Sequence, residues 1–218
     1  MLEVRDLSFK NRLFSVSLSC CPGEIHALLG ANGSGKSTFL KGVMGLLPVP
    51  STAVLWKSEP LHLKSRKEIS QILAWLPQQL SIPFDYTVEE FVAMGRYMHG
   101  NQGRLEPYFE KTETLAWKTR PLHELSQGEK QRVYLARALA TEAPVLLLDE
   151  PQAHLDLSRQ KQFWNLLKSL SQEGKILIVA NHDLANSQKY CSHATLLEGG
   201  CCVRQGKVLE LDIPSLFA

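Results

Sequence analysis

The chain has 218 residues, of which 44% are hydrophobic, and its 24 basic and 22 acidic residues give a formal net charge of +2. This composition excludes an intrinsically disordered chain, the length suits one domain or one domain with an insert, and the charge balance gives no reason to expect nucleic acid as a partner. No apolar run reaches the roughly 18 residues of a transmembrane helix and the amino terminus lacks a signal-peptide core, so we expect a cytosolic protein that contacts a membrane only through a partner.

The first part of the chain predicts three short strands followed by a helix. Apolar stretches at 4–9 and 14–19 indicate β-strands, and a turn at Pro22-Gly23 leads into a buried strand at 25–29. A helix is predicted from Lys36 to about Met44, ended by Gly42, Gly45 and Pro48. The loop between this strand and this helix carries the most informative motif of the chain.

Residues 30–37 read GANGSGKS, a full match to the phosphate-binding P-loop G-x-x-x-x-G-K-[ST]. Glycine allows positive φ and a close backbone approach to a polyphosphate, and backbone N–H groups at the helix start favour an anion. Lys36 can reach the β- and γ-phosphates and Ser37 can bind Mg²⁺. The alternative is a glycine-rich turn without a ligand, but the complete motif between a strand and a helix favours nucleotide binding. The predicted binding residues are Gly30, Ala31, Asn32, Gly33, Ser34, Gly35, Lys36, Ser37 and Thr38.

The rest of the chain alternates helices and strands. Helices are predicted near 65–71, from a capping box at Thr87 to about His99, at 126–140 and at 158–171, and strands at 72–76, 145–148 and 176–180. The last two strands are continuously apolar, which is typical of parallel strands buried on both faces, whereas 100–120 is polar and ambiguous. The fold class is therefore α/β, a P-loop NTPase core with a mostly parallel sheet, an antiparallel β portion at the amino terminus and a helical insert. We place the core at 1–79 and 126–218 and the insert at 80–125.

The predicted strand at 145–148 runs into two acidic residues, Asp149 and Glu150. Because successive side chains of a strand point in opposite directions, the two carboxylates are expected to have different roles. Asp149 can bind Mg²⁺ through water, and Glu150 can act as the general base that polarises the attacking water. Acids at a strand end are also common as solvated termini, and the upstream P-loop favours the catalytic interpretation.

The cysteines and most of the histidines carry no recognisable pattern. The five cysteines at 20, 21, 191, 201 and 202 do not have C-x-x-C spacing, so free thiols are expected, with a metal site built from the two pairs as a weaker alternative. His26, His62, His99, His123 and His193 have no metal-ligand spacing and are interpreted as ordinary surface or packed histidines.

A second motif, L-S-Q-G-E at 125–129, precedes a predicted helix. Ser126 and Glu129 have capping-box spacing, and a helix start that exposes the Gly128 N–H is also an anion site. With the P-loop, Gln78 after Pro77, the L-L-L-D-E strand, H-L-D at 154–156 and His182 in A-N-H-D-L, nearly the whole chain resembles the ATP-binding cassette (ABC) ATPase family.

The resemblance implies an ATPase that uses ATP and Mg²⁺ at a site shared by two subunits. Gln78 resembles the Q-loop glutamine, which touches Mg²⁺ or water, and His182 resembles the switch histidine at the γ-phosphate. Ser126 and Gly128 would bind the γ-phosphate of ATP held by the other subunit of an ATP-bound homodimer, and Asp156 resembles the D-loop aspartate at the dimer seam. An integral membrane permease, and indirectly a substrate-binding protein, would be the partners of a cassette peripheral to the inner face of the membrane.

Two features depart from the family pattern. The family signature is most often L-S-G-G-Q, whereas this chain has Gln127 and Glu129; the backbone N–H at 127 survives, so we expect function to be retained. The segment before the P-loop is short, and the aromatic residue that stacks on adenine in the family has only Phe9 or Phe14 as candidates, each of which is equally well explained as a strand aromatic.

The stretches L-A-W-L-P-Q-Q, F-D-Y-T-V-E-E-F-V-A-M-G-R-Y and A-H-L-D resemble ATPase subunits of metal-chelate importers, which handle iron-siderophores, haem, cobalamin, zinc or manganese. A soluble ABC protein of DNA repair or of the ribosome is the alternative, but the former carry long coiled coils before the signature and the latter usually two cassettes. A nucleotide kinase or a GTPase would lack the signature, and the guanine motif N-K-x-D is absent.

Overall fold

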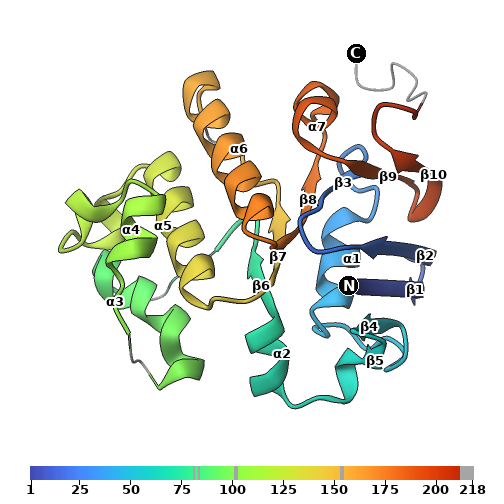
Figure 1. Cartoon of the computed structure of the whole chain (residues 1–218), viewed down its shortest axis with the longest axis horizontal. Helices are drawn as coiled ribbons and strands as arrows, with labels where there is room; N and C mark the ends of the chain where they lie inside the picture. The colour runs from blue at the N-terminus through green and yellow to red at the C-terminus, as the bar shows by residue number, and fades with distance from the viewer. Residues whose placement is uncertain (81, 83, 101–102, 153–154, 212–218) are drawn as a thin grey trace.

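The computed structural model describes residues 1–80, 82, 84–100, 103–152 and 155–211. Ten strands form one sheet in the order β5-β4-β1-β2-β10-β9-β3-β8-β7-β6, and a group of helices lies beyond the β6 side (Figure 1). This is the α/β architecture that the sequence predicts, with an antiparallel β portion, a parallel portion and a helical part.

The antiparallel portion contains β1 (Leu2–Phe9), β2 (Leu13–Cys20), β4 (Val54–Trp56) and β5 (Glu59–Pro60). The strand pairs β1–β2, β1–β4 and β4–β5 are all antiparallel. The short strands β4 and β5 were not predicted from the sequence. They are too short to show a two-residue period, so that only their pairing with β1 and with each other defines them.

The parallel portion contains β3 (Ile25–Leu29), β6 (Leu73–Leu76), β7 (Val145–Asp149), β8 (Ile176–Asn181) and β9 (His193–Glu198). Every residue of β3, β7 and β8 is buried, as expected for parallel strands covered on both faces. The strand β10 (Cys201–Lys207) is antiparallel to β9 and joins the two portions through a single pair, Cys201 with Phe14.

The helices follow the predicted positions closely where a capping signal exists. Capping boxes at Ser65, Thr87 and Ser126 start α2 (Arg66–Ile72), α3 (Val88–Ala93) and α5 (Gln127–Ala140). The other α-helices are α1 (Lys36–Val43), α4 (Glu106–Lys111), α6 (Leu157–Gln172) and α7 (Leu184–Tyr190), and the 3₁₀ segments are η1 (Leu61–Leu63), η2 (Met94–His99), η3 (Leu115–Trp117) and η4 (Leu122–Glu124).

The predicted helix up to His99 is α-helical only as far as Ala93 and continues as η2. Gly95 explains how this segment packs, because a Cβ there would lie 2.4 Å from the carbonyl oxygen of Arg137 in α5. The backbone of η2 therefore lies directly against α5, and no larger residue fits between them.

Three apolar clusters form the core. One packs α1 against the antiparallel strands and against one face of the parallel strands, and a second packs α5, α6 and α7 against the other face of the parallel strands. The third lies within the helical part, where Val88, Phe91 and Phe109 pack on one side of α5. Because Leu135 and Leu139 of α5 belong to the second cluster and Val133 and Ala136 to the third, α5 connects the core to the insert. The boundary at residue 125 stays a prediction.

His26 is a buried titratable group in this core. Its side chain is 1% exposed, its Nε2 lies 2.8 Å from the Thr195 hydroxyl, and its Nδ1 has no hydrogen-bond partner. The His193 ring is stacked on it at a centroid distance of 6.3 Å. Burial, and then the neighbouring His193, lower the pKa of His26 to about 4. The folded protein therefore holds this ring neutral.

We expect this histidine to make the fold sensitive to acid. The unfolded ring takes up its proton near its usual pKa of 6.5, whereas the folded ring does so near 4, so stability falls as the pH drops through this window. The loss is about 2 kcal/mol of unfolding free energy between pH 7 and pH 5. Urea unfolding at both pH values should show a smaller loss in His26→Asn than in the exposed-site control His123→Asn. Equal losses in the two variants would contradict the assignment.

Candidate functional site

The P-loop connects β3 to α1 in a tight turn. Gly30, Gly33 and Gly35 have φ values of 154°, 81° and 108°. At Gly30 a Cβ would lie 2.3 Å from the Ser34 Oγ and 2.5 Å from the Leu197 carbonyl oxygen, so no side chain fits there. Gly35 is the N-cap of α1, and the helix begins at Lys36. The loop thus presents backbone N–H groups at a helix start, as the motif predicts.

Lys36 is folded back over the loop. Its side chain is 5% exposed, and its Nζ donates to the carbonyl oxygens of Gly30 at 2.7 Å and Ala31 at 3.0 Å. The Oε1 of Glu150 lies 3.6 Å from the same Nζ. Burial lowers the pKa of Lys36, while the neighbouring Glu150 opposes that shift. The loop therefore holds the Lys36 ammonium group beside the cavity, and a phosphate bound there would stabilise this buried positive charge.

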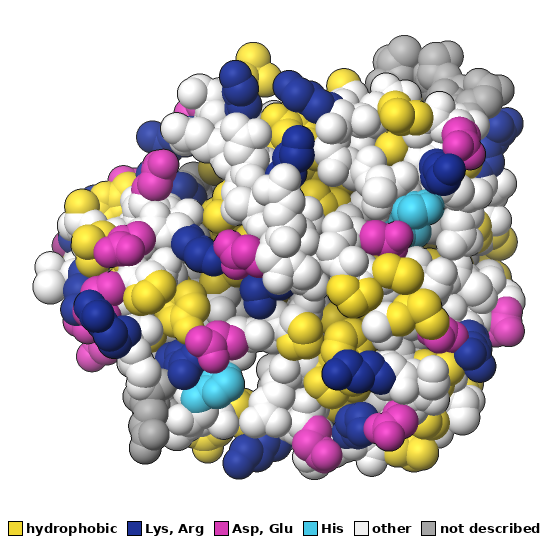
Figure 2. Space-filling view, viewed as in Figure 1, with side chains coloured by type: hydrophobic (Ala, Val, Ile, Leu, Met, Phe, Trp, Pro, Cys, Tyr) yellow, Lys and Arg dark blue, Asp and Glu magenta, His cyan; other side chains and the backbone are white. Residues whose placement is uncertain are grey.

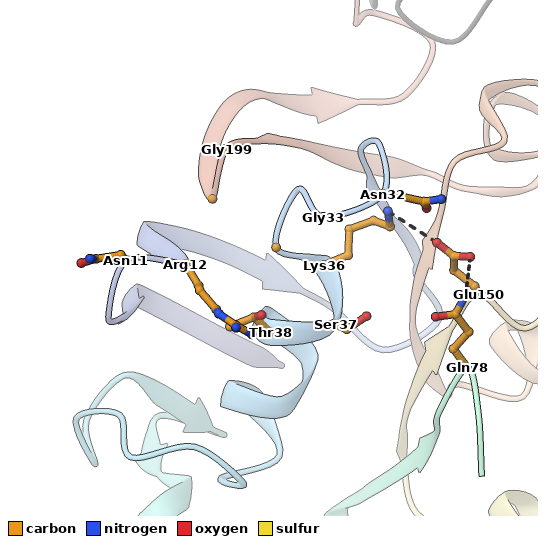
Figure 3. A pocket seen from close by; sticks show the side chains of 12 residues that line it. Asn11, Arg12, Asn32, Gly33, Lys36, Ser37, Thr38, Gln78, Glu150 and Gly199 are labelled. Carbon is orange, nitrogen blue, oxygen red and sulfur yellow. Dashed lines mark hydrogen bonds and ion pairs between the residues drawn. The ribbon is translucent and has the colours of Figure 1, made fainter. Parts of the chain in front are cut away.

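Three predicted catalytic residues meet at the ends of adjacent strands. Gln78 follows β6, Glu150 follows β7 and His182 follows β8. The Nε2 of Gln78 donates to the Oε2 of Glu150 at 3.0 Å, and the Nδ1 of His182 lies 3.9 Å from the Oε1 of Glu150. Figure 3 shows Gln78, Glu150 and Lys36 converging on one side of the cavity. Glu150 is the hub of this arrangement.

Glu150 does not continue the strand. Its φ is 47°, in the left-handed region, and its backbone N–H donates to the Ala180 carbonyl oxygen at 2.9 Å. Strand alternation predicts opposite directions for Asp149 and Glu150, but Glu150 lies just beyond the end of β7, and its left-handed backbone separates the two carboxylates.

Asp149, the last residue of β7, is 2% exposed, and its Oδ1 has no hydrogen-bond partner. Burial raises the pKa of Asp149, and a hydrogen bond from Ser37 of α1 opposes that shift. A carboxylate oxygen that is buried without a partner, next to a hydroxyl of the P-loop, suits a hard cation such as Mg²⁺. Ser37 and Asp149 thus fit the metal that the sequence predicts.

The signature residues lie elsewhere. Ser126 is the exposed N-cap of α5, and Gly128 lies in its first turn. Asp156 is the N-cap of α6, where its carboxylate accepts from the Arg159 N–H at 2.9 Å. None of these three residues lines the P-loop cavity. His154 and Ala153, which contribute to the H-L-D and A-H-L-D resemblance, lie outside the described residues.

The P-loop borders a cavity of about 600 Å³ (Figure 3). Its described lining residues are Asn11, Arg12, Asn32, Gly33, Gly35, Lys36, Ser37, Thr38, Gln78, Glu150, Gly199 and Gly200. Sequence reasoning missed Asn11 and Arg12 in the β1–β2 turn and the glycine pair of the β9–β10 turn. The Gly199-Gly200 pair is a recognisable hairpin signal, but no local pattern marks Arg12. Phe9 and Phe14, the candidates for an adenine-stacking aromatic, are not among the lining residues.

Three expectations about other sites concern the described residues only. All five cysteines are free thiols. Across residues 1–211, apart from the undescribed gaps, no cluster of three or more His, Cys, Asp or Glu side chains is arranged to hold a metal ion. Within the same residues, no helix combines the length and the apolar character needed to cross a membrane. On the face shown in Figure 2, basic and acidic side chains are interspersed over the surface.

Comparison with known proteins identifies relatives along most of the chain. The ABC transporter family profile matches residues 13–153. The iron(3+)-hydroxamate import ATP-binding protein FhuC of Bacillus subtilis is 34% identical over 93% of this chain and 79% of its own length. The hemin import ATP-binding protein HmuV of Shewanella denitrificans is 36% identical over 92% of this chain and 84% of its own. The uncharacterized ABC transporter ATP-binding protein YvrA of Bacillus subtilis is 38% identical over 85% of this chain, which spans 45% of that protein.

Solved structures agree with this result. The cbiO1 protein of Clostridium perfringens, part of the cbiONQ ABC transporter complex, has a TM-score of 0.81 and 29% identity over 96% of this chain and 89% of its own. The dimeric structure of MJ0796, a bacterial ABC transporter cassette, has a TM-score of 0.84 and 25% identity over 95% of this chain and 99% of its own.

Proposed function

The chain belongs to the ABC transporter family, as an ATP-hydrolysing cassette, and we propose that it drives uptake of a metal chelate or metal ion through a separate membrane permease. The import proteins for iron(3+)-hydroxamate and hemin described above, together with a manganese transport ATP-binding protein of Synechocystis that is 36% identical over 91% of this chain, support this substrate class. No observation favours the alternative of a soluble cassette without a transporter. The observation that carries the catalytic part of the proposal is the convergence of Gln78, Lys36 and His182 on Glu150.

Different residues of the site bind the phosphates, bind the metal and accept the proton during ATP hydrolysis. The P-loop backbone and Lys36 would hold the β- and γ-phosphates, and Ser37 and Asp149 would hold Mg²⁺, with Gln78 close by at the same strand edge. When bound, Mg²⁺ neutralises part of the phosphate charge. Glu150 accepts a proton from the attacking water, and Gln78 orients the Glu150 carboxylate through its amide N–H. His182, beside the same carboxylate, would contact the γ-phosphate.

The site is completed by a second copy of the chain. Ser126 and Gly128 lie at the start of a 14-residue helix, a favourable position for an anion, yet neither borders the cavity of their own subunit. In a head-to-tail homodimer they would cover the γ-phosphate bound by the other subunit, with Asp156 at the seam. The dimeric arrangement of the MJ0796 cassette supports this assembly.

The docking segment for the permease is the stretch at 80–91, of which residues 81 and 83 lie outside the described part. It begins two positions after Gln78, whose side chain donates a hydrogen bond to Glu150, so the segment is close in the chain to the catalytic carboxylate. Phe84 is 65% exposed, and the Tyr86 ring packs edge-on against it at a centroid distance of 6.0 Å. Tyr86 is half-buried against the third apolar cluster, so Phe84 is the exposed ring of the pair, and an exposed aromatic ring of this kind favours an interface. The chain would then act at the cytoplasmic face of the membrane, with a substrate-binding protein involved only indirectly and no nucleic-acid partner.

We expect cysteines at Phe84 or Tyr86 to crosslink to the cytoplasmic loops of a co-expressed permease. The native cysteines are replaced first, and Val203→Cys on β10, which is also exposed but lies on another element, serves as the control. The yield should change when ATP is added, because closure of the dimer moves the insert. If no position from 80 to 91 crosslinks while the complex still co-purifies, the docking surface lies elsewhere. If no permease co-purifies at all, the transporter assignment itself is wrong.

A further inference from the structure

The cavity at the P-loop has a phosphate end and a nucleoside end. Gln78 and Glu150 lie on one side of it and Asn11 and Arg12 on the other, with Lys36, Ser37 and Thr38 between them (Figure 3). On the proposed function, on which this inference rests, Glu150 marks the position of the γ-phosphate. The nucleoside must therefore extend past Thr38 toward the β1–β2 turn.

The nucleoside end is polar rather than apolar. Among the described residues that line the cavity, none is aromatic or aliphatic beyond the P-loop, and the walls at this end come from Asn11, Arg12, Gly199 and Gly200. Phe9 is partly buried and packs on the first core cluster. Phe14 is 46% exposed, but its ring lies behind Gly200, with the Phe14 Cδ2 3.2 Å from the position of a Cβ on that glycine. A purine placed here would find no aromatic ring on the cavity wall.

The backbone of Arg12 is held tightly in this position. Its N–H donates to the Phe9 carbonyl oxygen at 3.1 Å. Its own carbonyl oxygen would be 2.5 Å from a Cβ on Gly200 and 3.2 Å from one on Gly35, and both glycines have positive φ. The turn is therefore clamped between the start of α1 and the β9–β10 turn.

The guanidinium of Arg12, in contrast, is available for a ligand. The side chain is exposed and makes no hydrogen bond or ion pair with any described residue. A planar cation on a fixed backbone, at the edge of a nucleotide cavity, has the chemistry to stack on a nucleobase.

We propose that Arg12 is the base-contacting residue of this cassette, its guanidinium plane lying on the face of the purine. Stacking of this kind uses the π-face that every base has and does not read the hydrogen-bonding edge. The site therefore discriminates weakly between adenine and guanine, and guanine nucleotides are bound and hydrolysed nearly as well as adenine nucleotides.

The test is calorimetric binding of ADP, GDP and inorganic pyrophosphate, each with Mg²⁺, to the full chain. We expect the wild type to bind ADP and GDP within about fivefold of each other, since stacking tolerates either purine. Arg12→Ala should weaken both nucleotides by about 3- to 30-fold and leave pyrophosphate unchanged. Arg12→Tyr should restore nucleotide affinity, whereas Arg12→Lys should not, because it keeps the charge but lacks the plane. Phe14→Ala, a control two residues further along the same hairpin, should leave the affinity for both nucleotides unchanged.

Several results would overturn the assignment. An equal loss of pyrophosphate affinity in Arg12→Ala would make Arg12 a phosphate contact, and full affinity in Arg12→Lys would show that charge alone suffices. A preference for ADP over GDP of about 100-fold or more would indicate that the base edge is read by hydrogen bonds. Loss of ADP affinity in Phe14→Ala but not in Arg12→Ala would assign the contact to Phe14. Failure of the ATP-hydrolysing site, the part of the proposed function on which this inference rests, looks different, because the wild type would then bind neither ADP nor pyrophosphate.

Discussion

Replacing Glu150 with Gln should lower the rate of ATP hydrolysis by about 10²–10⁴-fold while ATP binding persists, since loss of a positioned general base typically costs this much. The glutamine keeps the shape of the side chain but cannot accept a proton from water. The P-loop contacts of Lys36 and the buried carboxylate of Asp149 are unchanged, so phosphate and Mg²⁺ binding should remain. The variant should accumulate as an ATP-bound dimer, measured by phosphate release and by size-exclusion chromatography with ATP.

The exposed Glu198→Gln, at the end of β9, is the control for the chemical change. Gln and Glu face the same left-handed backbone conformation at position 150, so thermal unfolding should change little. Turnover of Glu150→Gln near that of the wild type would remove Glu150 from the role of general base and leave its contacts with Gln78 and Lys36 as structural only.

Mixing Lys36→Ala subunits with Ser126→Arg subunits should restore ATPase activity that neither variant has alone. A homodimer of either variant has two damaged sites. A mixed dimer has one intact site, which combines Lys36 of one subunit with Ser126 of the other. Random pairing of equal amounts gives up to about a quarter of wild-type activity, because half of the dimers are mixed and each has one of its two sites intact. Steady-state phosphate release before and after mixing measures the gain.

Ser126 also caps α5, since its hydroxyl accepts from the Glu129 N–H at 3.4 Å, and loss of a cap costs about 1 kcal/mol of stability. Ser126→Asn, which retains capping without the bulk of arginine, separates the two effects. Full activity of Ser126→Arg alone would mean that the signature is only a helix cap. Mixed samples no more active than the sum of their parts would argue against a site shared between subunits.

The sequence by itself determined the features that depend on neighbouring residues. The P-loop, the capping boxes at Thr87 and Ser126 and the fully buried strands β3, β7 and β8 are recognisable because their chemistry is local: a glycine at positive φ, a side chain that caps a helix start, or a mostly apolar run buried on both faces. The helices α4 and α7 and the strands β9 and β10 were not predicted. The strand β10, largely exposed and polar, is a strand only because β9 pairs with it.

The tertiary structure decided which of these features meet. Gln78, Glu150 and His182 are far apart in the chain and converge because β6, β7 and β8 are adjacent and parallel, which brings their carboxyl ends to one edge. The burial that leaves Asp149 without a partner likewise depends on the packed sheet. Arg12 is the clearest case, since no periodicity or motif marks it. It borders the nucleotide cavity only because two glycines, at positions 35 and 200, let the backbone of distant segments approach its carbonyl oxygen.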